Sequence, residues 1–224
     1  MPPVDKRYRY VYKPLIWIAA LAPAALMIAA IFGVGPFELG AEPARKILHT
    51  CGKTALNLLL LTLCVTPLRQ LAHQPNLQRL RRLLGLFAFF YACTHFVVYA
   101  WLDQGLDLKA IGEDIVKRPY ITIGVLGLLL LIPLAVTSTQ AMMRRLRRRW
   151  QTLHRLVYAV AILGVWHYYW QVKKDVREPL IYAGILALLL GYRVWRGPVR
   201  RWLEARRAAR ATSQSAPATA PERT

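Results

Sequence analysis

The chain has 224 residues, of which 56% are hydrophobic, and its mean hydropathy is +0.29. This composition leaves room for several membrane spans but for no large soluble domain, so it predicts an all-α, polytopic membrane protein. The net charge of +20 is accompanied by no recognised nucleic-acid-binding motif, and we therefore expect no nucleic-acid partner.

Six apolar runs are candidates for transmembrane helices. In chain order they lie near residues 14–32, 47–68, 83–102, 120–137, 153–170 and 180–195. The first run has no clear cleavage pattern and contains Pro23, so we interpret it as a retained helix and not as a cleaved signal. A bundle of six transmembrane helices puts both termini on the same side of the membrane.

The basic residues indicate which side that is. They precede the first expected span, fill the second and fourth connections and follow the last span, so that 21 of the 31 lysines and arginines lie on one side. The other three connections hold eight, together with most of the acidic residues. By the positive-inside rule, both termini are predicted to be cytoplasmic. Besides setting the topology, the net positive charge is expected to attract the protein to anionic membrane lipid.

Two histidines in the expected spans point to a metal site. His95 in the third span and His167 in the fifth lie about 18 Å and about 24 Å from the cytoplasmic ends of their helices. Neutral imidazole is a common axial ligand of haem iron, so one iron porphyrin between these spans would take an imidazole from each. The alternative is that each histidine donates a hydrogen bond to a carbonyl of a neighbouring helix or lies at the lipid headgroups.

His154 opens the fifth expected span, only about 5 Å from its start, and has no equally clear partner. Where a second pair would need a histidine in the third span, the chain has Arg81 and Arg82. His154 could bind a second haem with an unusual sixth ligand, contact a flavin or quinone, or form a hydrogen bond at the interface. His49, near the outer surface, could replace one of the ligands, steady a haem propionate, meet a partner protein or be a polar interfacial residue.

Five segments, which span most of residues 45–195, resemble the MsrQ family. These are haem-binding membrane subunits of bacterial periplasmic methionine sulfoxide reductase systems, within the ferric-reductase-like transmembrane group. The segments are HTCGKTALNLLLLTLCVTPLR, RLRRLLGLFAFFYACTHFVVY, KRPYITIGVLGL, AVTSTQAMMRRLRRRWQTLHRLVYAVAIL and HYYWQVK.

The resemblance implies a multi-pass protein of the bacterial inner membrane that carries haem b, one or two groups, and FMN. It implies a non-catalytic electron-transfer subunit that takes electrons from the quinone pool or from a cytoplasmic flavin reductase. The acceptor would be a periplasmic molybdenum-containing subunit that reduces methionine sulfoxide in oxidised proteins. The haem-associated, iron-binding histidines carried over to this chain are His95, His154 and His167. No FAD or NADPH domain follows the last expected span, so we expect a separate donor.

We accordingly expect three parts. Residues 1–13 form a cytoplasmic N-terminal segment, residues 14–196 form a six-helix ferric-reductase-like haem-binding domain, and residues 197–224 form a basic and then disordered cytoplasmic tail. Two other functions are compatible with the buried histidines, namely a small proton-coupled transporter and a non-redox membrane anchor for a periplasmic enzyme. A transporter would bind no haem, and an anchor would keep its function after replacement of the histidines.

Overall fold

The computed structural model describes residues 6–36, 38–172 and 175–196, and all the regular structure within these ranges is helical. The chain divides into two compact units, residues 1–186 and 187–224. In the second unit the described residues 187–196 continue the helix that begins at Arg177. The expected cytoplasmic tail, residues 197–224, lies outside the described residues, as do the first five residues of the expected N-terminal segment.

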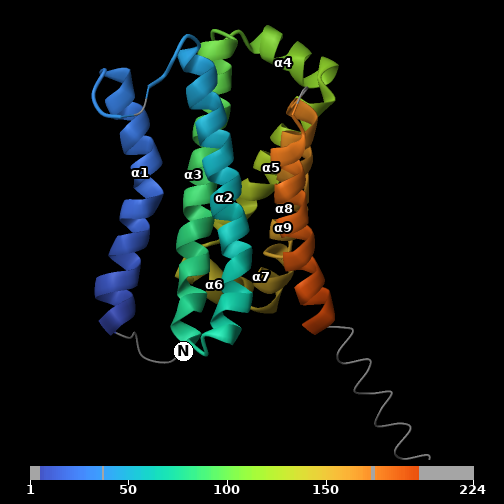
Figure 1. Ribbon diagram of the computed structural model, residues 1–224. Coiled ribbons are helices and arrows are strands. Elements are labelled where there is room, and N and C mark those ends of the chain that lie inside the picture. The colour runs from blue at the N-terminus through green and yellow to red at the C-terminus, as the bar shows by residue number, and fades with distance from the viewer. Residues whose placement is uncertain (1–5, 37, 173–174, 197–224) are drawn as a thin grey trace, which may run out of the picture. The chain divides into compact units, whose positions relative to one another are not determined.

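The helices follow one another with short connections (Figure 1). Their bounds are η1 Tyr8–Tyr12, α1 Lys13–Ile31, α2 Pro43–Leu71, η2 Pro75–Arg79, α3 Leu80–Val98, η3 Tyr99–Asp103, α4 Leu108–Lys117, α5 Pro119–Val136, α6 Gln140–Leu146, α7 Arg148–Leu153, α8 Leu156–Gln171 and α9 Arg177–Val194.

Local sequence accounts for where several of these helices start. Proline stands at the first position of α2 and of α5, where its missing N–H costs nothing and its fixed φ suits a helix. The carboxylate of Asp107 caps α4 by accepting hydrogen bonds from the backbone N–H groups of Lys109 and Ala110 at 2.8 and 3.1 Å. The α4 helix was not expected from the sequence, and it fills the connection between α3 and α5.

Four helical stretches of the described chain are long and apolar enough to cross a membrane: Tyr8–Ile31, Pro43–Leu71, Asn76–Asp103 and Pro119–Val136. They correspond to the first four expected spans. The last two expected spans correspond to α8, with 16 residues, and to α9, with 18, and neither belongs to that set. The chain is thus an all-helical membrane protein, while the six-span topology with cytoplasmic termini stays a prediction.

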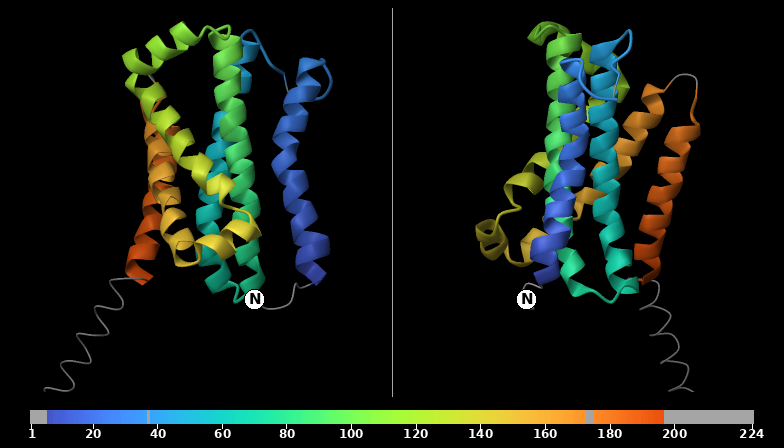
Figure 2. Two further views of the ribbon diagram at one scale, coloured as in Figure 1. Left: turned by 180° about the vertical axis from the view of Figure 1, so that it is seen from behind. Right: turned by 60° about the vertical axis from the view of Figure 1, so that its left-hand side comes forward.

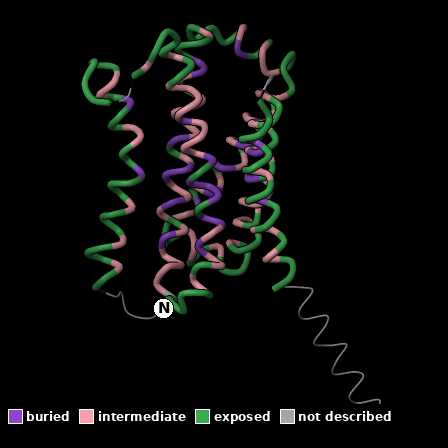
Figure 3. The backbone as a smooth tube through the Cα atoms, in the orientation of Figure 1, coloured by how far each residue is buried: buried purple, intermediate pink, exposed green. Residues whose placement is uncertain are grey.

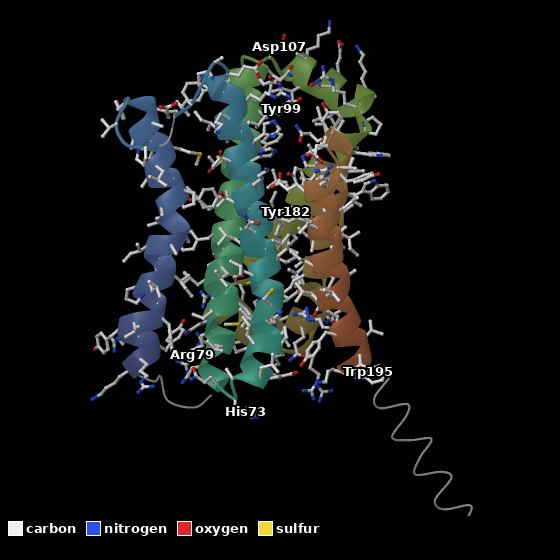
Figure 4. All side chains as sticks on the ribbon, viewed as in Figure 1. His73, Arg79, Tyr99, Asp107, Tyr182 and Trp195 are labelled. Atoms are coloured by element: carbon white, nitrogen blue, oxygen red, sulfur yellow. The ribbon has the colours of Figure 1, made fainter. Side chains whose placement is uncertain are left out.

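Within the first unit, α2 packs along α3 and α5 packs along α8, and α3 also contacts α5 (Figures 1 and 2). Side chains labelled in Figure 4 mark the two ends of this bundle. His73 and Arg79 lie at the end where α6 and α7 are found, and Tyr99 and Asp107 lie at the end where α4 is found. We call these the α6–α7 end and the α4 end.

The expectation of one continuous helix across His154 is wrong. The α7 helix ends at Leu153, and His154 and Arg155 form a turn before α8 begins at Leu156. The turn is tightened by bonds between residues three apart, from the Arg155 N–H to the Thr152 carbonyl at 3.2 Å and from the Tyr158 N–H to the Arg155 carbonyl at 3.0 Å. His154 therefore lies outside the helix that carries His167.

The α1 helix contacts α2 and α3 only lightly, and its buried residues are Ala20 and Met27 (Figure 3). Pro23 lies inside α1 and cannot donate a backbone hydrogen bond. The hydroxyl of Tyr91 on α3, which is fully buried, donates to the carbonyl of Ala20 at 2.7 Å and accepts from the N–H of Ala24 at 3.1 Å. One side chain of α3 thus bridges the donor and the acceptor of a helical turn next to the proline.

We predict that Tyr91→Phe lowers the stability of the protein by about 1–2 kcal/mol, because two backbone groups of α1 lose their partner where lipid offers no substitute. Thermal unfolding of the detergent-solubilised protein measures the effect. Tyr10→Phe, which removes a hydroxyl from an exposed tyrosine, is the control. Equal unfolding midpoints for Tyr91→Phe and the control would contradict the bridging role.

Candidate metal and cofactor site

A cavity of about 550 Å³ lies between α2, α3, α5 and α8. Its volume is within the range of about 300–1,000 Å³ that is usual for small-molecule and cofactor sites. Most of its wall is apolar, with side chains such as Leu56, Ala88, Leu131 and Val160. Two imidazoles, those of His95 and His167, also line it. The cavity is therefore a largely apolar space into which two potential metal ligands project.

A backbone carbonyl of α2 fixes the ring of His95. The Nδ1 atom of His95 lies 2.9 Å from the carbonyl oxygen of Leu48. Because a carbonyl oxygen only accepts hydrogen bonds, Nδ1 must carry the proton, and the Nε2 atom of the neutral ring keeps its lone pair. This is the tautomer that binds a metal through Nε2, with a second hydrogen bond that holds the ring in place.

His167 on α8 is held in the same way by α5. Its Nδ1 atom lies 2.7 Å from the carbonyl oxygen of Tyr120, so its Nε2 atom is also unprotonated in the neutral ring. The two hydrogen bonds, from His95 to Leu48 and from His167 to Tyr120, are related by one constant spacing along the chain. His167 follows His95 by 72 residues, and Tyr120 follows Leu48 by the same number. The pairs α2–α3 and α5–α8 thus repeat one arrangement of carbonyl and imidazole.

The rings of His95 and His167 lie at a distance from each other that suits one metal ion between them. Their centroids are 6.1 Å apart, and their planes are inclined by 82°. A metal–imidazole nitrogen bond is about 2.0–2.1 Å long, and a ring centre lies about 1 Å behind its nitrogen, so two imidazoles on opposite sides of a metal have centres roughly 6 Å apart. The structure brings His95 and His167 together, as the sequence predicts.

Glycines make room for both rings. A Cβ atom added at Gly52 on α2 would lie 3.0 Å from Nδ1 of His95, and one added at Gly124 on α5 would lie 2.9 Å from Nδ1 of His167. Each glycine stands one helical turn after the carbonyl that accepts the hydrogen bond, and the two are again 72 residues apart. The sequence signal for Gly52, whose spacing to Gly124 repeats that of the two histidines, was missed.

His154 does not join this pair. Its ring stacks on the indole of Trp150 at a centroid distance of 3.9 Å, and its Nε2 atom lies 3.1 Å from the hydroxyl oxygen of Thr137. That hydroxyl uses its proton in a bond to the Pro133 carbonyl at 2.6 Å, so it accepts from Nε2 of His154. In this arrangement His154 presents a protonated Nε2 to the protein. Its role as a metal ligand stays a prediction.

The cavity opens toward the α4 end through a second cavity of about 900 Å³, which shares five lining residues with it. These are Arg45, His49, Arg118, Tyr120 and Gln171. The amide nitrogen of Gln171 lies 3.4 Å from Nε2 of His49. His49 is thus part of a polar mouth, in line with its expected place near the surface. His73 is exposed in the loop after α2.

An acidic residue of α4 holds Arg118 at this mouth. Asp114 accepts hydrogen bonds from the hydroxyl of Tyr99 at 3.1 Å and from the amide of Gln104 at 3.2 Å, and its other oxygen lies 3.1 Å from Nε of Arg118. A hydrogen bond to Tyr120, followed by the charge of Asp114, raises the pKa of Arg118. The guanidinium is therefore a permanent cation at the cavity mouth.

A lysine inside the second expected span also has a partner. Nζ of Lys53 lies 2.6 and 2.8 Å from the two carboxylate oxygens of Glu178 at the start of α9. The hydroxyl of Tyr182, labelled in Figure 4, donates to Oδ1 of Asn57 at 2.7 Å. Both contacts join the first half of α9 to α2 within the first unit. The pairing explains how α2 carries a lysine among apolar residues.

The chain is similar to known proteins over most of its length. Residues 51–165 match the family described as "Ferric reductase like transmembrane component". The chain is 51% identical over 210 residues, 92% of its length and 94% of the relative's, to the "Protein-methionine-sulfoxide reductase heme-binding subunit MsrQ" of Xanthomonas campestris pv. campestris. The proteins of the same name from Xanthomonas axonopodis pv. citri and Bordetella pertussis are 52% and 46% identical, over 87% and 82% of this chain and 91% and 90% of the relatives.

We predict that Gly124→Ala destabilises the protein by about 1–3 kcal/mol, because the new methyl group pushes the ring of His167 away from the Tyr120 carbonyl. Gly127→Ala is the matched control on the same helix, since its Cβ would meet Leu163 at an ordinary 3.8 Å. Chemical or thermal unfolding in detergent measures both. If the two variants unfold alike, the close fit between Gly124 and His167 does not matter for folding.

Proposed function

The chain belongs to the MsrQ family within the ferric-reductase-like transmembrane proteins, and from this we propose that it is a membrane electron-transfer subunit that binds haem b. The observation that carries the proposal is the pair His95 and His167, two imidazoles with metal-binding tautomers at a spacing that suits one iron atom. The residues of the cavity fit the group, because a flat apolar macrocycle needs apolar walls and two axial ligands.

Haem, when bound, supplies the one-electron chemistry, and the protein supplies binding, orientation and electrostatics. In this chain the carbonyls of Leu48 and Tyr120 hold both imidazoles in the tautomer that offers Nε2. Hydrogen bonding from Nδ1 to a carbonyl also makes the ligating nitrogen more basic. With His95 and His167 as its two protein ligands, the iron would have no open position, and this would favour electron transfer over binding of oxygen or of a substrate.

The proposed topology has six helices across the bacterial inner membrane, with α8 and α9 added to the four apolar spans and with both termini in the cytoplasm. Residues 1–13 and 197–224 are the proposed cytoplasmic segments, and residues 14–196 form the haem-binding domain. The clustering of arginines near α6 and α7, and of acidic residues in and around α4, supports this orientation. The α4 end then faces the periplasm.

The proposed electron path runs from the cytoplasmic or membrane side to the periplasm. The donor is the quinone pool or a cytoplasmic flavin reductase, and the acceptor is a periplasmic molybdenum-containing subunit that reduces methionine sulfoxide in proteins. The names of the relatives, as subunits of a protein-methionine-sulfoxide reductase, support the acceptor. FMN is proposed on the family resemblance, and no residue of this chain is assigned to it.

His154 remains a proposed haem-associated residue, and with it a second haem. Its present hydrogen bond to Thr137 occupies Nε2, so ligation through that atom requires this bond to break. The repeat that relates the two helix pairs places Arg82 opposite His154, since the two residues are also 72 positions apart. A second site would therefore lack the paired imidazole that the first site has.

We predict that His95→Ala and His167→Ala each remove most of the bound haem, because each leaves one axial position without its ligand. The purified, full-length protein is assayed for haem per chain by the pyridine haemochromogen method. His73→Ala, in the exposed loop after α2, is the control and should keep the content of the unchanged protein. Unchanged haem in both cavity variants would sink the ligand assignment, whereas an unchanged protein that carries no haem would leave the transporter and anchor alternatives.

The same assay on His154→Ala tests the proposed role of that residue. A lower haem content supports it, and an unchanged content removes His154 from the site.

A further inference from the structure

The mouth of the His95–His167 cavity has a different chemistry from its interior. The inner wall is largely apolar, whereas Arg45 and Arg118 line both the inner cavity and the second cavity outside it. Arg45 lies in the first turn of α2, and Arg118 lies between α4 and α5, so the two cations come from separate elements. A ligand that spans the two cavities meets apolar walls at one end and two guanidinium groups at the other.

We propose that Arg118 and Arg45 bind the two carboxylates of haem, and that they orient the group with its carboxylate edge toward the α4 end. The proposal rests on the proposed function, because it assigns residues to the haem of that site. The physical reason is the high cost in free energy of burying a carboxylate among apolar side chains without a partner. A group with an apolar ring and two carboxylates on one edge is therefore matched by this cavity in one orientation.

Arg118 is prepared for such a contact. The Asp114 carboxylate lies 3.1 Å from its Nε atom and is itself held by Tyr99 and Gln104. Guanidinium has five N–H donors in a rigid plane, so the bonds to Asp114 and Tyr120 leave further N–H groups to meet a carboxylate. Asp114 is thus a positioning residue that keeps the arginine at the mouth. The side chain of Asp114 is only 14% exposed, which strengthens its hold on Arg118.

Arg45 is held more loosely. Its partner Glu42 lies 3.1 Å away on the same helical turn, and both side chains are about two-thirds exposed. A surface pair of this kind contributes little to stability, so Arg45 is able to exchange Glu42 for another carboxylate at small cost. Lys53, the other cation on the cavity wall, is already bound by both oxygens of Glu178. The two arginines are therefore the cations best suited to bind an incoming carboxylate.

The test compares ordinary haem with its dimethyl ester, in which both carboxylates are neutral. Four full-length proteins in detergent are loaded separately with each form of haem. They are the unchanged protein, Arg118→Gln, Arg45→Gln and the control Lys117→Gln. Lys117 is the neighbouring cation, paired with Glu113 at 2.7 Å, and does not line either cavity. The rate of transfer to apomyoglobin reports how tightly each form is held, and the midpoint potential reports the charge around it.

With ordinary haem, we expect each arginine variant to lose the group roughly ten-fold faster than the unchanged protein, and Lys117→Gln to lose it at the unchanged rate. The midpoint potential of the arginine variants should fall, because a nearby cation favours the reduced form, which carries one more negative charge. With the dimethyl ester, the unchanged protein should already lose the group quickly, and the arginine replacements should have no further effect.

Two results would overturn the proposal. If the unchanged protein holds ester and ordinary haem equally well, the carboxylates are not bound by these residues. If an arginine replacement speeds the loss of both forms by the same factor, that arginine acts only on the packing of the protein. Arg45 lies in α2, away from the connection between α4 and α5. If Arg118→Gln fails to fold, the Arg45→Gln variant therefore still tests the proposal. Failure of the unchanged protein to bind either form would instead overturn the proposed function.

Discussion

Two backbone carbonyls near the α4 end of the bundle, those of Leu48 and Tyr120, determine the rest of the site. Inside a bilayer no water is at hand to satisfy a polar group, so an imidazole on a buried helix face must find a partner within the protein. The carbonyls of Leu48 and Tyr120 provide that partner, and they also determine which nitrogen of His95 and His167 carries the proton. The same contact requires glycine at positions 52 and 124, because each imidazole ring lies where the Cβ atom of any other residue would be.

The same contact appears twice, once between α2 and α3 and once between α5 and α8, with a constant offset of 72 residues. The two copies meet across one cavity. The repeat of one local arrangement, an imidazole bound to a backbone carbonyl, therefore supplies both candidate ligands. The mouth of the cavity breaks the repeat, because α4 and its hydrogen-bonded Asp114 lie on one side only. In this account the repeated part binds the metal centre, and the unrepeated part determines the orientation and access of the ligand.

Much of this was predictable from the sequence. The length and apolarity of the runs gave the first four spans, and the comparison of depth along two helices paired His95 with His167. The turn at His154 was not predicted, because the run from Trp150 to Trp170 has the length and overall apolarity of one span. The contacts of Trp150 and His154 with Thr137, at the end of α5, are not visible in the sequence. The α4 helix and the role of Asp114 were missed for a similar reason. Their residues look like a solvated acidic loop until Tyr99, Gln104 and Arg118 are brought around them.

The central claim is that two imidazoles of fixed tautomer hold one iron porphyrin between them, and the visible spectrum of the purified protein tests it most directly. The dithionite-reduced minus oxidised spectrum should show sharp b-type bands, and carbon monoxide should leave the reduced spectrum unchanged, because both axial positions are occupied by histidine. A protein that stays colourless after expression with ample haem, or whose reduced form binds carbon monoxide readily, would contradict the account.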